Sequence, residues 1–181
     1  MAVAPQAQKE RTEIRLGGFG GQGIVTAGYL LGRAAILEGK HAVLTKAFGP
    51  EIRGARVVAD VIISAEAVDY PKVTQPDILV CFAQDAYDRL SPLLNTEGKI
   101  FIDEDLVNIP ERVEFEVFRI KAQRLAEQLG SRVVTNNVML GFLVAVTEVI
   151  SREALERALL ETVHPKAREL NQRALQAGFK Y

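Results

Sequence analysis

The alternation of apolar, β-rich runs with helical patterns is the feature that most limits the fold of this chain. The runs expected to form strands are residues 13–17, 41–48, 55–64, 77–83, 99–105 and, as an edge strand, 113–120. Helical periodicity follows the first run at residues 23–39 and the fourth run at residues 84–94. Such strand–helix units predict an α/β fold, a doubly wound and mostly parallel Rossmann-like sheet with helices on both faces.

Two parts of the chain depart from this regular plan. The connection between the second and third runs is too short for a helical crossover, so these runs form either an antiparallel pair or an irregular excursion. From Lys121 onward the patterns are helical, which predicts a helical C-terminal third. The expected helix boundaries are Gly130 as a stop, Asn136 or Asn137 as a cap, Ser151 as a cap, and Pro165 and Gly178 as the limits of the last helix.

Composition excludes several classes of protein. With 22 basic and 23 acidic side chains the formal charge is -1, which gives no strong attraction to nucleic acid or to an anionic membrane. The longest nearly apolar stretch, 136–150, is shorter than the roughly 20 residues that span a bilayer. Residues 1–12 lack the pattern of a signal peptide and are expected to be a flexible tail before a single domain at 13–181. A cytoplasmic location follows as the expectation.

The chain has one cysteine, Cys81. A single cysteine excludes an internal disulfide and any all-cysteine metal or iron–sulfur site built by this chain alone. Because Cys81 lies in the apolar run DILVCF, we interpret it as a buried thiol in a strand.

A glycine-rich stretch, GGFGGQGIVTAG, joins the first predicted strand to the first predicted helix. Gly18, Gly20 and Gly23 match the pattern G-x-G-x-x-G in the context that a dinucleotide fingerprint requires. Glycines there permit positive φ and let a phosphate approach backbone N–H groups at a helix N-terminus. The alternative is a tight turn that packs helix against strand and binds no ligand.

The second half of the dinucleotide signature is missing. An NAD site needs an acidic residue at the end of the second strand to bind the ribose hydroxyls. Thr45 and Lys46 stand at that position, and Glu38 comes too early, before the strand. Lys46 leaves NADP open, but the sequence argues against NAD.

The stretch FGPEIRGA after the second predicted strand is a second candidate loop. Glu51 and Arg53 lie two residues apart between glycine-containing turns. Ligands of doubly wound proteins bind at the carboxyl ends of strands, so we expect this loop and the glycine-rich stretch to face one crevice. Arg53 there suits a phosphate or a carboxylate. The alternative is a surface salt bridge in a structural turn.

Together, GGFGGQGIVTAG, FGPEIRGA and NNVMLG resemble the gamma subunit, or gamma domain, of the 2-oxoacid:ferredoxin oxidoreductases. The resemblance extends over residues 13–178. It implies a part in the oxidative decarboxylation of pyruvate, 2-oxoglutarate or branched-chain 2-oxoacids, which yields an acyl-CoA, carbon dioxide and reduced ferredoxin. The stretch ISAEAVDYPKVTQPDILV, with its DYPKV, is more similar to gamma chains of the 2-oxoglutarate enzymes than to those of the pyruvate enzymes.

The resemblance also implies where the cofactors lie. Thiamine diphosphate and its magnesium ion belong to the alpha and beta subunits, and iron–sulfur clusters to cysteine-rich parts of other chains, with a delta subunit as a further candidate. The gamma part packs on the catalytic subunits and helps to form the region of the co-substrate coenzyme A. On this basis the chain alone holds no cofactor or metal, carries no catalytic residue, is inactive in isolation and meets ferredoxin only through the complex.

The resemblance suggests a set of site residues by their match to the family motifs. They are Gly18, Gly20, Gly21, Gln22, Gly23, Glu51, Arg53, Asn136 and Asn137. The two asparagines match an asparagine-rich turn and are expected to bond the glycine-rich stretch or a partner's backbone, or simply to cap a helix. Relatives commonly carry glycine where this chain has Ala55, and its extra methyl group is expected to restrict backbone approach.

Other candidate groups give no catalytic site. His41 and His164 have no nucleophile beside them that the sequence reveals, and we interpret the acidic cluster at 103–105 as a solvated turn rather than a metal site. The helix expected at 138–150 is apolar on almost every face, so it is either central to the domain or buried by another subunit. The competing function is a self-contained Rossmann-type NADP- or FAD-binding oxidoreductase or sensor. The missing acid and the missing catalytic pair favour the subunit.

Overall fold

The computed structural model describes residues 11–51 and 54–181. Its centre is a six-stranded sheet in the order β2-β3-β1-β4-β5-β6. The strands are β1 (Arg11–Phe19), β2 (His41–Phe48), β3 (Arg56–Ser64), β4 (Ile78–Cys81), β5 (Lys99–Asp103) and β6 (Glu116–Ile120). β1, β4, β5 and β6 pair in parallel, whereas β3 runs antiparallel to both of its neighbours. The prediction of a mostly parallel sheet is confirmed, and the short connection does produce an antiparallel pair.

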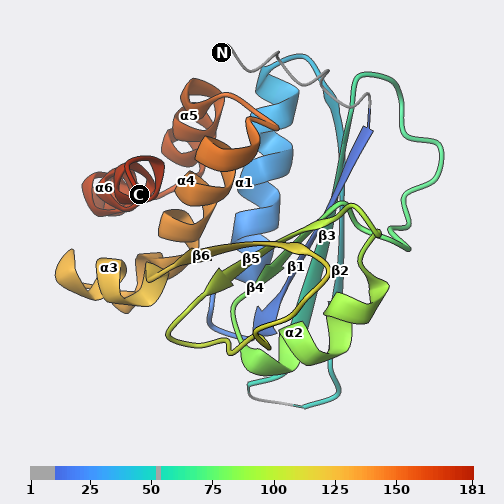
Figure 1. Cartoon of the computed structure of the whole chain (residues 1–181). Helices are drawn as coiled ribbons and strands as arrows, with labels where there is room; N and C mark the ends of the chain where they lie inside the picture. The colour runs from blue at the N-terminus through green and yellow to red at the C-terminus, as the bar shows by residue number, and fades with distance from the viewer. Residues whose placement is uncertain (1–10, 52–53) are drawn as a thin grey trace, which may run out of the picture.

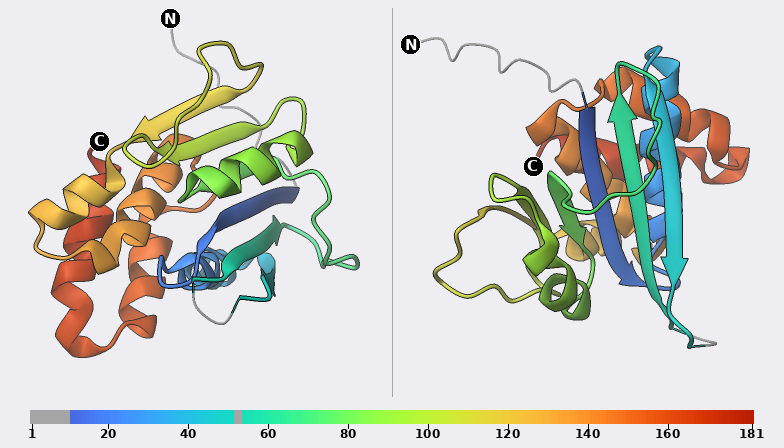
Figure 2. Two further views of the ribbon diagram at one scale, coloured as in Figure 1. Left: turned by 90° about the horizontal axis from the view of Figure 1, so that it is seen from below. Right: turned by 90° about the vertical axis from the view of Figure 1, so that its right-hand side faces the viewer.

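Helices cover both faces of this sheet (Figures 1 and 2). The α-helices are α1 (Ile24–Leu37), α2 (Gln84–Leu90), α3 (Ala122–Gln128), α4 (Thr135–Thr147), α5 (Arg152–Thr162) and α6 (Arg168–Phe179), and short 3-10 turns are η1 (Ser91–Leu93), η2 (Arg132–Val134) and η3 (Pro165–Ala167). α2 lies alone on one face, and the other α-helices form a layer on the opposite face. Everything after β6 is helical, as predicted. Within the described residues, no helix is long and apolar enough to cross a membrane.

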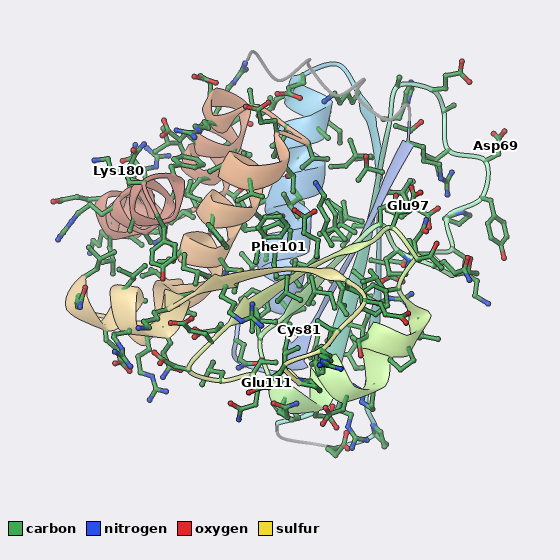
Figure 3. All side chains as sticks on the ribbon, viewed as in Figure 1. Asp69, Cys81, Glu97, Phe101, Glu111 and Lys180 are labelled. Carbon is green, nitrogen blue, oxygen red and sulfur yellow. The ribbon has the colours of Figure 1, made fainter. Side chains whose placement is uncertain are left out.

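Two hydrophobic cores fill the space on either side of the sheet. The larger core joins β1, β3 and the layer of α1, α4, α5 and α6, and it contains Phe101. The smaller core lies under α2 and contains Cys81. Figure 3 labels both side chains, which come from the neighbouring strands β5 and β4 and belong to different cores. The apolar helix α4 is therefore central to this chain, since Val138, Leu140 and Leu143 are fully buried within it.

A buried ion pair lies on the same face of the sheet as α2, since Ile14 and Leu16 on either side of Arg15 belong to the opposite core. Arg15 on β1 donates two hydrogen bonds of 2.7 Å to the carboxylate of Asp60 on β3. The same guanidinium donates to the carbonyl of Val73, at 2.8 Å. Arg15 thus ties the long connection 65–77 down onto the sheet, and this connection contains the DYPKV stretch.

The helix ends confirm some of the predicted boundaries and correct others. Gly130 ends its helix with φ 103° and the Ser151 hydroxyl accepts from the N–H of Ala154, as predicted. Asn136 and Asn137 do not cap α4, because the helix begins one residue earlier, at Thr135. Gly178 is the penultimate residue of α6, which ends at Phe179, one residue beyond the predicted limit.

Position 178 requires glycine because α4 and α6 pack very closely. A Cβ atom on Gly178 would overlap the carbonyl oxygen of Val138, and one on Gly141 would overlap the carbonyl oxygen of Leu175. The two glycines therefore form a contact of backbone against backbone. This contact joins the last helix to the middle of the larger core.

The strand bounds and the acidic turn also differ from the prediction. β1 begins at Arg11, β6 begins at Glu116 rather than 113, and residues 1–10 lie outside the described part. Asp103 is fully buried, not part of a solvated turn. Its carboxylate accepts from the N–H groups of Asp105 and Gln123 at 3.1 and 2.7 Å, so it links the end of β5 to the start of α3.

Candidate functional site

The residues that connect β1 to α1, Gly20–Gly23, are called the glycine loop below. The loop lies at the carboxyl end of β1, beside the carboxyl end of the neighbouring parallel strand β4. α1 leaves this edge on one face of the sheet and α2 on the other. This is the topological switch point at which open α/β sheets bind their ligands.

The backbone of the glycine loop is open on its outer side. Gly21 and Gly23 have φ angles of 95° and 75°, and a Cβ on Gly21 would meet no atom within 4 Å. Gly23 is the N-cap of α1, without a side-chain cap and without an acidic residue in the first turn. Among the described residues, the N–H groups of Gly21 and Gly23 have no partner. The positive end of the α1 dipole therefore faces outward with free donors, as an anion requires.

Gln22 closes the inner side of the loop. Its Oε1 accepts from the N–H of Phe19 at 2.7 Å, and its Nε2 donates to the carbonyl of Phe82 at 2.8 Å. The amide thus bridges the ends of β1 and β4. A Cβ on Gly18 would lie 2.5 Å from Gln22 Oε1, so glycine at position 18 is needed to make room for the amide. Gly18 is buried under this bridge, whereas Gly20 and Gly21 are exposed.

The two predicted loops lie together. The N–H of Gly20 donates to the carbonyl of Ala55 at 2.8 Å, which joins the glycine loop to the connection between β2 and β3. Glu51 is exposed and pairs with Arg56 at 3.9 Å. Arg53 lies outside the described residues. Because the Gly20 donor is already used inside the protein, only the later part of the loop offers free N–H groups.

A row of charges that the sequence did not suggest borders the loop. Arg56 pairs with Asp85 at 3.1 Å, and Asp85 pairs with Arg89 at 2.9 Å. Burial acts to raise the pKa of Asp85, but the hydrogen bond and charge of Arg89, together with Arg56, hold that pKa below its ordinary value. Asp85 therefore stays ionised and keeps both guanidinium groups at the carboxyl edge. The row joins the start of β3 to α2. Local sequence patterns do not predict the pair of Arg56 and Asp85, because these residues are far apart in the chain.

The two asparagines of NNVMLG have different environments. Asn136 is buried and donates from Nδ2 to the carbonyl of Gly23 at 3.3 Å, so it holds the glycine loop against α4. Asn137 is also buried, but it donates to Asn171 on α6. Its own Oδ1 has no hydrogen-bond partner among the described residues. Only Asn136 belongs to the candidate site.

The topology explains why the acidic residue of the dinucleotide signature is missing. In the fold that binds NAD, the second strand lies next to the first. Here β3 lies between β1 and β2, so Thr45 and Lys46 are one strand farther from the glycine loop. The place next to the loop is taken by Ala55 and Arg56 at the start of the antiparallel strand. A ribose-binding acid at the end of β2 would therefore not reach a nucleotide on this loop.

Outside the glycine loop, the titratable side chains of the described residues do not form a second candidate site. Burial raises the pKa of the Cys81 thiol far above its ordinary value, which leaves it protonated and unreactive. Burial also raises the pKa of Asp103, with smaller contributions from Asp105 and Glu104 and against two backbone N–H bonds. The described His, Cys, Asp and Glu side chains form no group of three or more that could hold a metal ion.

Comparison with known proteins agrees with this fold and with the three motifs. Residues 13–181 match the family described as pyruvate ferredoxin/flavodoxin oxidoreductase. The 2-oxoglutarate synthase subunit KorC of Methanocaldococcus jannaschii is 44% identical over 176 residues, which cover 95% of this chain and 94% of that protein.

Solved structures show the same architecture. The gamma subunit of a keto/oxoacid ferredoxin oxidoreductase from Geobacter sulfurreducens matches with a TM-score of 0.83 and 37% identity, over 93% of this chain and 96% of that one. A 2-oxoglutarate:ferredoxin oxidoreductase from Magnetococcus marinus matches in fold with a TM-score of 0.84 at 24% identity, and the match covers 95% of this chain but 30% of that one. The same fold thus occurs both as a separate subunit and within a longer chain. The chain described here belongs to the pyruvate ferredoxin/flavodoxin oxidoreductase family and is a gamma-type subunit of a 2-oxoacid:ferredoxin oxidoreductase.

Proposed function

We propose that this subunit serves a 2-oxoglutarate:ferredoxin oxidoreductase, which forms succinyl-CoA, carbon dioxide and reduced ferredoxin. The high identity to a 2-oxoglutarate synthase subunit over almost the whole of both chains supports this choice of 2-oxoacid. Residues 13–181 act in it as one domain. Alpha and beta subunits, with or without a delta subunit, hold the thiamine diphosphate, its magnesium ion and the iron–sulfur clusters. The complex works in the cytoplasm, and the isolated subunit is inactive.

The glycine loop is the part of this chain that meets the rest of the enzyme and its coenzyme A. The observation that supports this role is the pair of unused N–H groups of Gly21 and Gly23 at the uncapped N-terminus of α1. Coenzyme A carries phosphate groups, and a helix N-terminus with free donors suits them. Glu51 and Arg53 lie in the adjoining connection, and the row that begins at Arg56 places two guanidinium groups beside it, each paired with a carboxylate.

The interior of the loop has a different part in this proposal. The Gln22 amide and the buried Gly18 keep the ends of β1 and β4 together, while Asn136 fixes Gly23. These residues position the exposed glycines and do not themselves reach a ligand. Asn137, which faces α6, contributes to the helical layer alone.

A self-contained NADP- or FAD-binding enzyme is not favoured. The Gln22 amide spans the ends of β1 and β4, where the crevice of a dinucleotide site would lie, and Ala55 uses the N–H of Gly20. A pyrophosphate would need that crevice and that donor in the ordinary dinucleotide site. Calorimetric titration of the isolated chain with NADPH is therefore expected to give no heat of binding at micromolar concentrations.

The test of the proposal is a bulkier residue at Gly20 in the full complex. Gly20→Val places a branched side chain on the exposed outer face of the loop, where no packing atom lies closer than 3.7 Å to the new Cβ. We expect either loss of subunits on purification or a rise of about tenfold in the KM for coenzyme A, equal to about 1.4 kcal/mol, with little change in the KM for 2-oxoglutarate. Ala67→Val is the matched control, because Ala67 is exposed and follows the end of β3 that lies away from the glycine loop.

Three readouts separate the parts of the proposal. Co-purification reports on the interface, the KM for coenzyme A reports on the loop as a binding element, and activity with 2-oxoglutarate against pyruvate reports on the 2-oxoacid. Intact assembly with an unchanged KM for coenzyme A in Gly20→Val would exclude the role of the loop. A complex that prefers pyruvate would exclude the 2-oxoglutarate assignment and leave the loop proposal standing.

A further inference from the structure

The outer edge of β2 is a long, unpaired strand edge. β2 is the last strand on its side of the sheet, and no described residue pairs with its second edge (Figure 2, right). The N–H of Gly49 donates to the carbonyl of Arg56, which continues the register of β2 with β3. The backbone N–H and C=O groups of the odd-numbered residues of 41–49 therefore point toward β3. In an antiparallel pair these residues alternate with residues that point outward. The outward N–H and C=O groups belong to Ala42, Leu44, Lys46 and Phe48.

The helix beside this edge has a free side. Gly28 and Gly32 of α1 face β2, because added Cβ atoms would lie 2.9 Å from Leu44 Cδ1 and 3.7 Å from Ala42 Cβ. Another side of α1 faces α5, where Arg33 pairs with Glu161 at 2.7 Å. With 3.6 residues per turn, the sector between these two sides contains Tyr29 and Ile36.

Large apolar side chains are exposed along this sector and on the strand. Tyr29 is 47% exposed, Ile36 is 51% exposed and Phe48 at the end of β2 is 60% exposed. Phe48 shares its face of the sheet with Ala42 and Leu44, since side chains alternate along a strand. We call Tyr29, Ile36, Ala42, Leu44 and Phe48 the edge strip. The strip combines apolar surface with a row of unused backbone donors and acceptors.

The edge strip has little of the usual protection of an exposed edge. Proteins that remain monomeric protect such strands with prolines, bulges or charges. β2 pairs with β3 without interruption from His41 to Phe48, has no proline and has one charged residue, Lys46. The opposite edge strand, β6, has five residues and exposes Glu116 and Arg119. The sheet is therefore protected at one edge and open at the other.

We propose that β2 pairs antiparallel with β2 of a second copy of this chain, with a two-fold axis at Thr45. In this register Leu44 lies opposite Lys46 of the other copy, and Ala42 lies opposite Phe48. All four residues have outward backbone groups and side chains on the α1 face, so the hydrogen bonds and the faces match together. The result is one continuous sheet across two subunits.

The self-pairing is supported by the sizes and charges of the strip residues. The large Phe48 lies opposite the small Ala42 of the other copy, and α1 of each copy places its free sector on the same side. Lys46 lies opposite Leu44, so the two Lys46 residues are diagonal neighbours rather than a directly opposed pair of like charges, which would be more destabilising. A two-fold axis makes each contact occur twice, as in other isologous dimers.

The register gives a direct test by cross-linking. Thr45 faces its own copy as a non-hydrogen-bonded pair, with Cα atoms about 4.5 Å apart, which is within the range of a disulfide. Thr45→Cys, oxidised in the purified chain and in the purified complex, is expected to give a disulfide-linked dimer of this chain as the main product. Val43→Cys is the matched control, because it lies on the same strand and face but roughly 13 Å from its copy in this register. Cys81 is fully buried and does not interfere.

A second variant tests the association without a cross-link. Phe48→Lys changes a residue that is exposed in the single chain, so the far-UV circular dichroism is expected to remain unchanged while sedimentation shifts from dimer to monomer. A wild-type chain that sediments as a monomer at all concentrations, together with no disulfide-linked dimer of Thr45→Cys in the complex, would overturn the proposal. A disulfide from the Thr45→Cys variant to a different subunit would overturn it as well and would assign the edge strip to that subunit. Equal cross-linking of Thr45→Cys and Val43→Cys would show random collision and reject the register.

Discussion

Glycines have opposite roles in two regions of this subunit. Between α4 and α6, Gly141 and Gly178 are glycines because backbone atoms of the facing helix lie where a Cβ would be. In the glycine loop, a Cβ on Gly20 would have only ordinary contacts, at 3.7 Å or more, and one on Gly21 would have none within 4 Å. The helix pair needs glycine for packing, whereas the exposed part of the loop has unfilled space around it. Substitutions in the two regions are therefore expected to differ in their effect on stability.

The largest effect is expected in the helix pair. Gly178→Ala would force α6 away from the carbonyl of Val138 and open the larger core, so we expect a loss of about 3 kcal/mol or more in the free energy of unfolding. Urea denaturation followed by circular dichroism measures it. Gly32→Ala on α1 is the control, since its new Cβ would lie 3.7 Å from Ala42 and alanine favours a helix. A stable Gly178→Ala chain would show that the helices can separate at little cost.

An intermediate effect is expected at Gly23, where the two regions meet. Its φ of 75° disfavours a side chain, and a Cβ would lie 2.5 Å from Nδ2 of Asn136 on α4. Gly23→Ala is expected to cost about 2 kcal/mol, of which roughly half is backbone strain. A double-mutant cycle with Asn136→Ala separates the two causes, because removing the asparagine relieves the contact but not the strain. Fully additive losses would contradict a direct contact between the two residues.

The smallest effect is expected at Gly20. Its φ is not positive and a Cβ has room, so Gly20→Ala should change the free energy of unfolding by less than about 0.5 kcal/mol. Gly21→Ala, in the same loop but at φ 95°, is the comparison and should lose about 1 kcal/mol or more. Denaturation midpoints of the two variants, measured side by side, give the answer. If Gly20→Ala were as unstable as Gly178→Ala, the distinction between the two regions would fail.

Much of the fold could be predicted because its signals are local. Apolar runs and turn residues set the order of strands and helices, and the short connection after residue 48 left an antiparallel pair as one of two possibilities. The rule that ligands bind at carboxyl ends of strands placed the glycine loop beside the segment after β2, and the bond from Gly20 to Ala55 joins them. The motifs GGFGGQGIVTAG, FGPEIRGA and NNVMLG together indicated the type of subunit.

The remaining features depend on contacts between residues far apart in the sequence. No local pattern shows that the Gln22 amide reaches Phe82, or that Asn136 bonds Gly23 while Asn137 turns to α6. The acidic turn looked solvated because three acids follow one another, but Asp103 is buried and bonded to the start of α3, a helix much later in the chain. Gly178 was interpreted as a helix stop, because the sequence does not reveal that the facing helix α4 lies against its backbone.

The position of β1 has a consequence for synthesis and folding. Of the six described strands β1 is made first, but its two neighbours in the sheet are β3 and β4. Both of its edges are paired only after Cys81, the last residue of β4, has been made. Until then this central strand of the sheet has no complete pairing, and contacts of such long sequence separation form slowly. The emerging chain therefore has a long period in which an apolar strand is available to wrong partners, and in which binding by a chaperone has the greatest value.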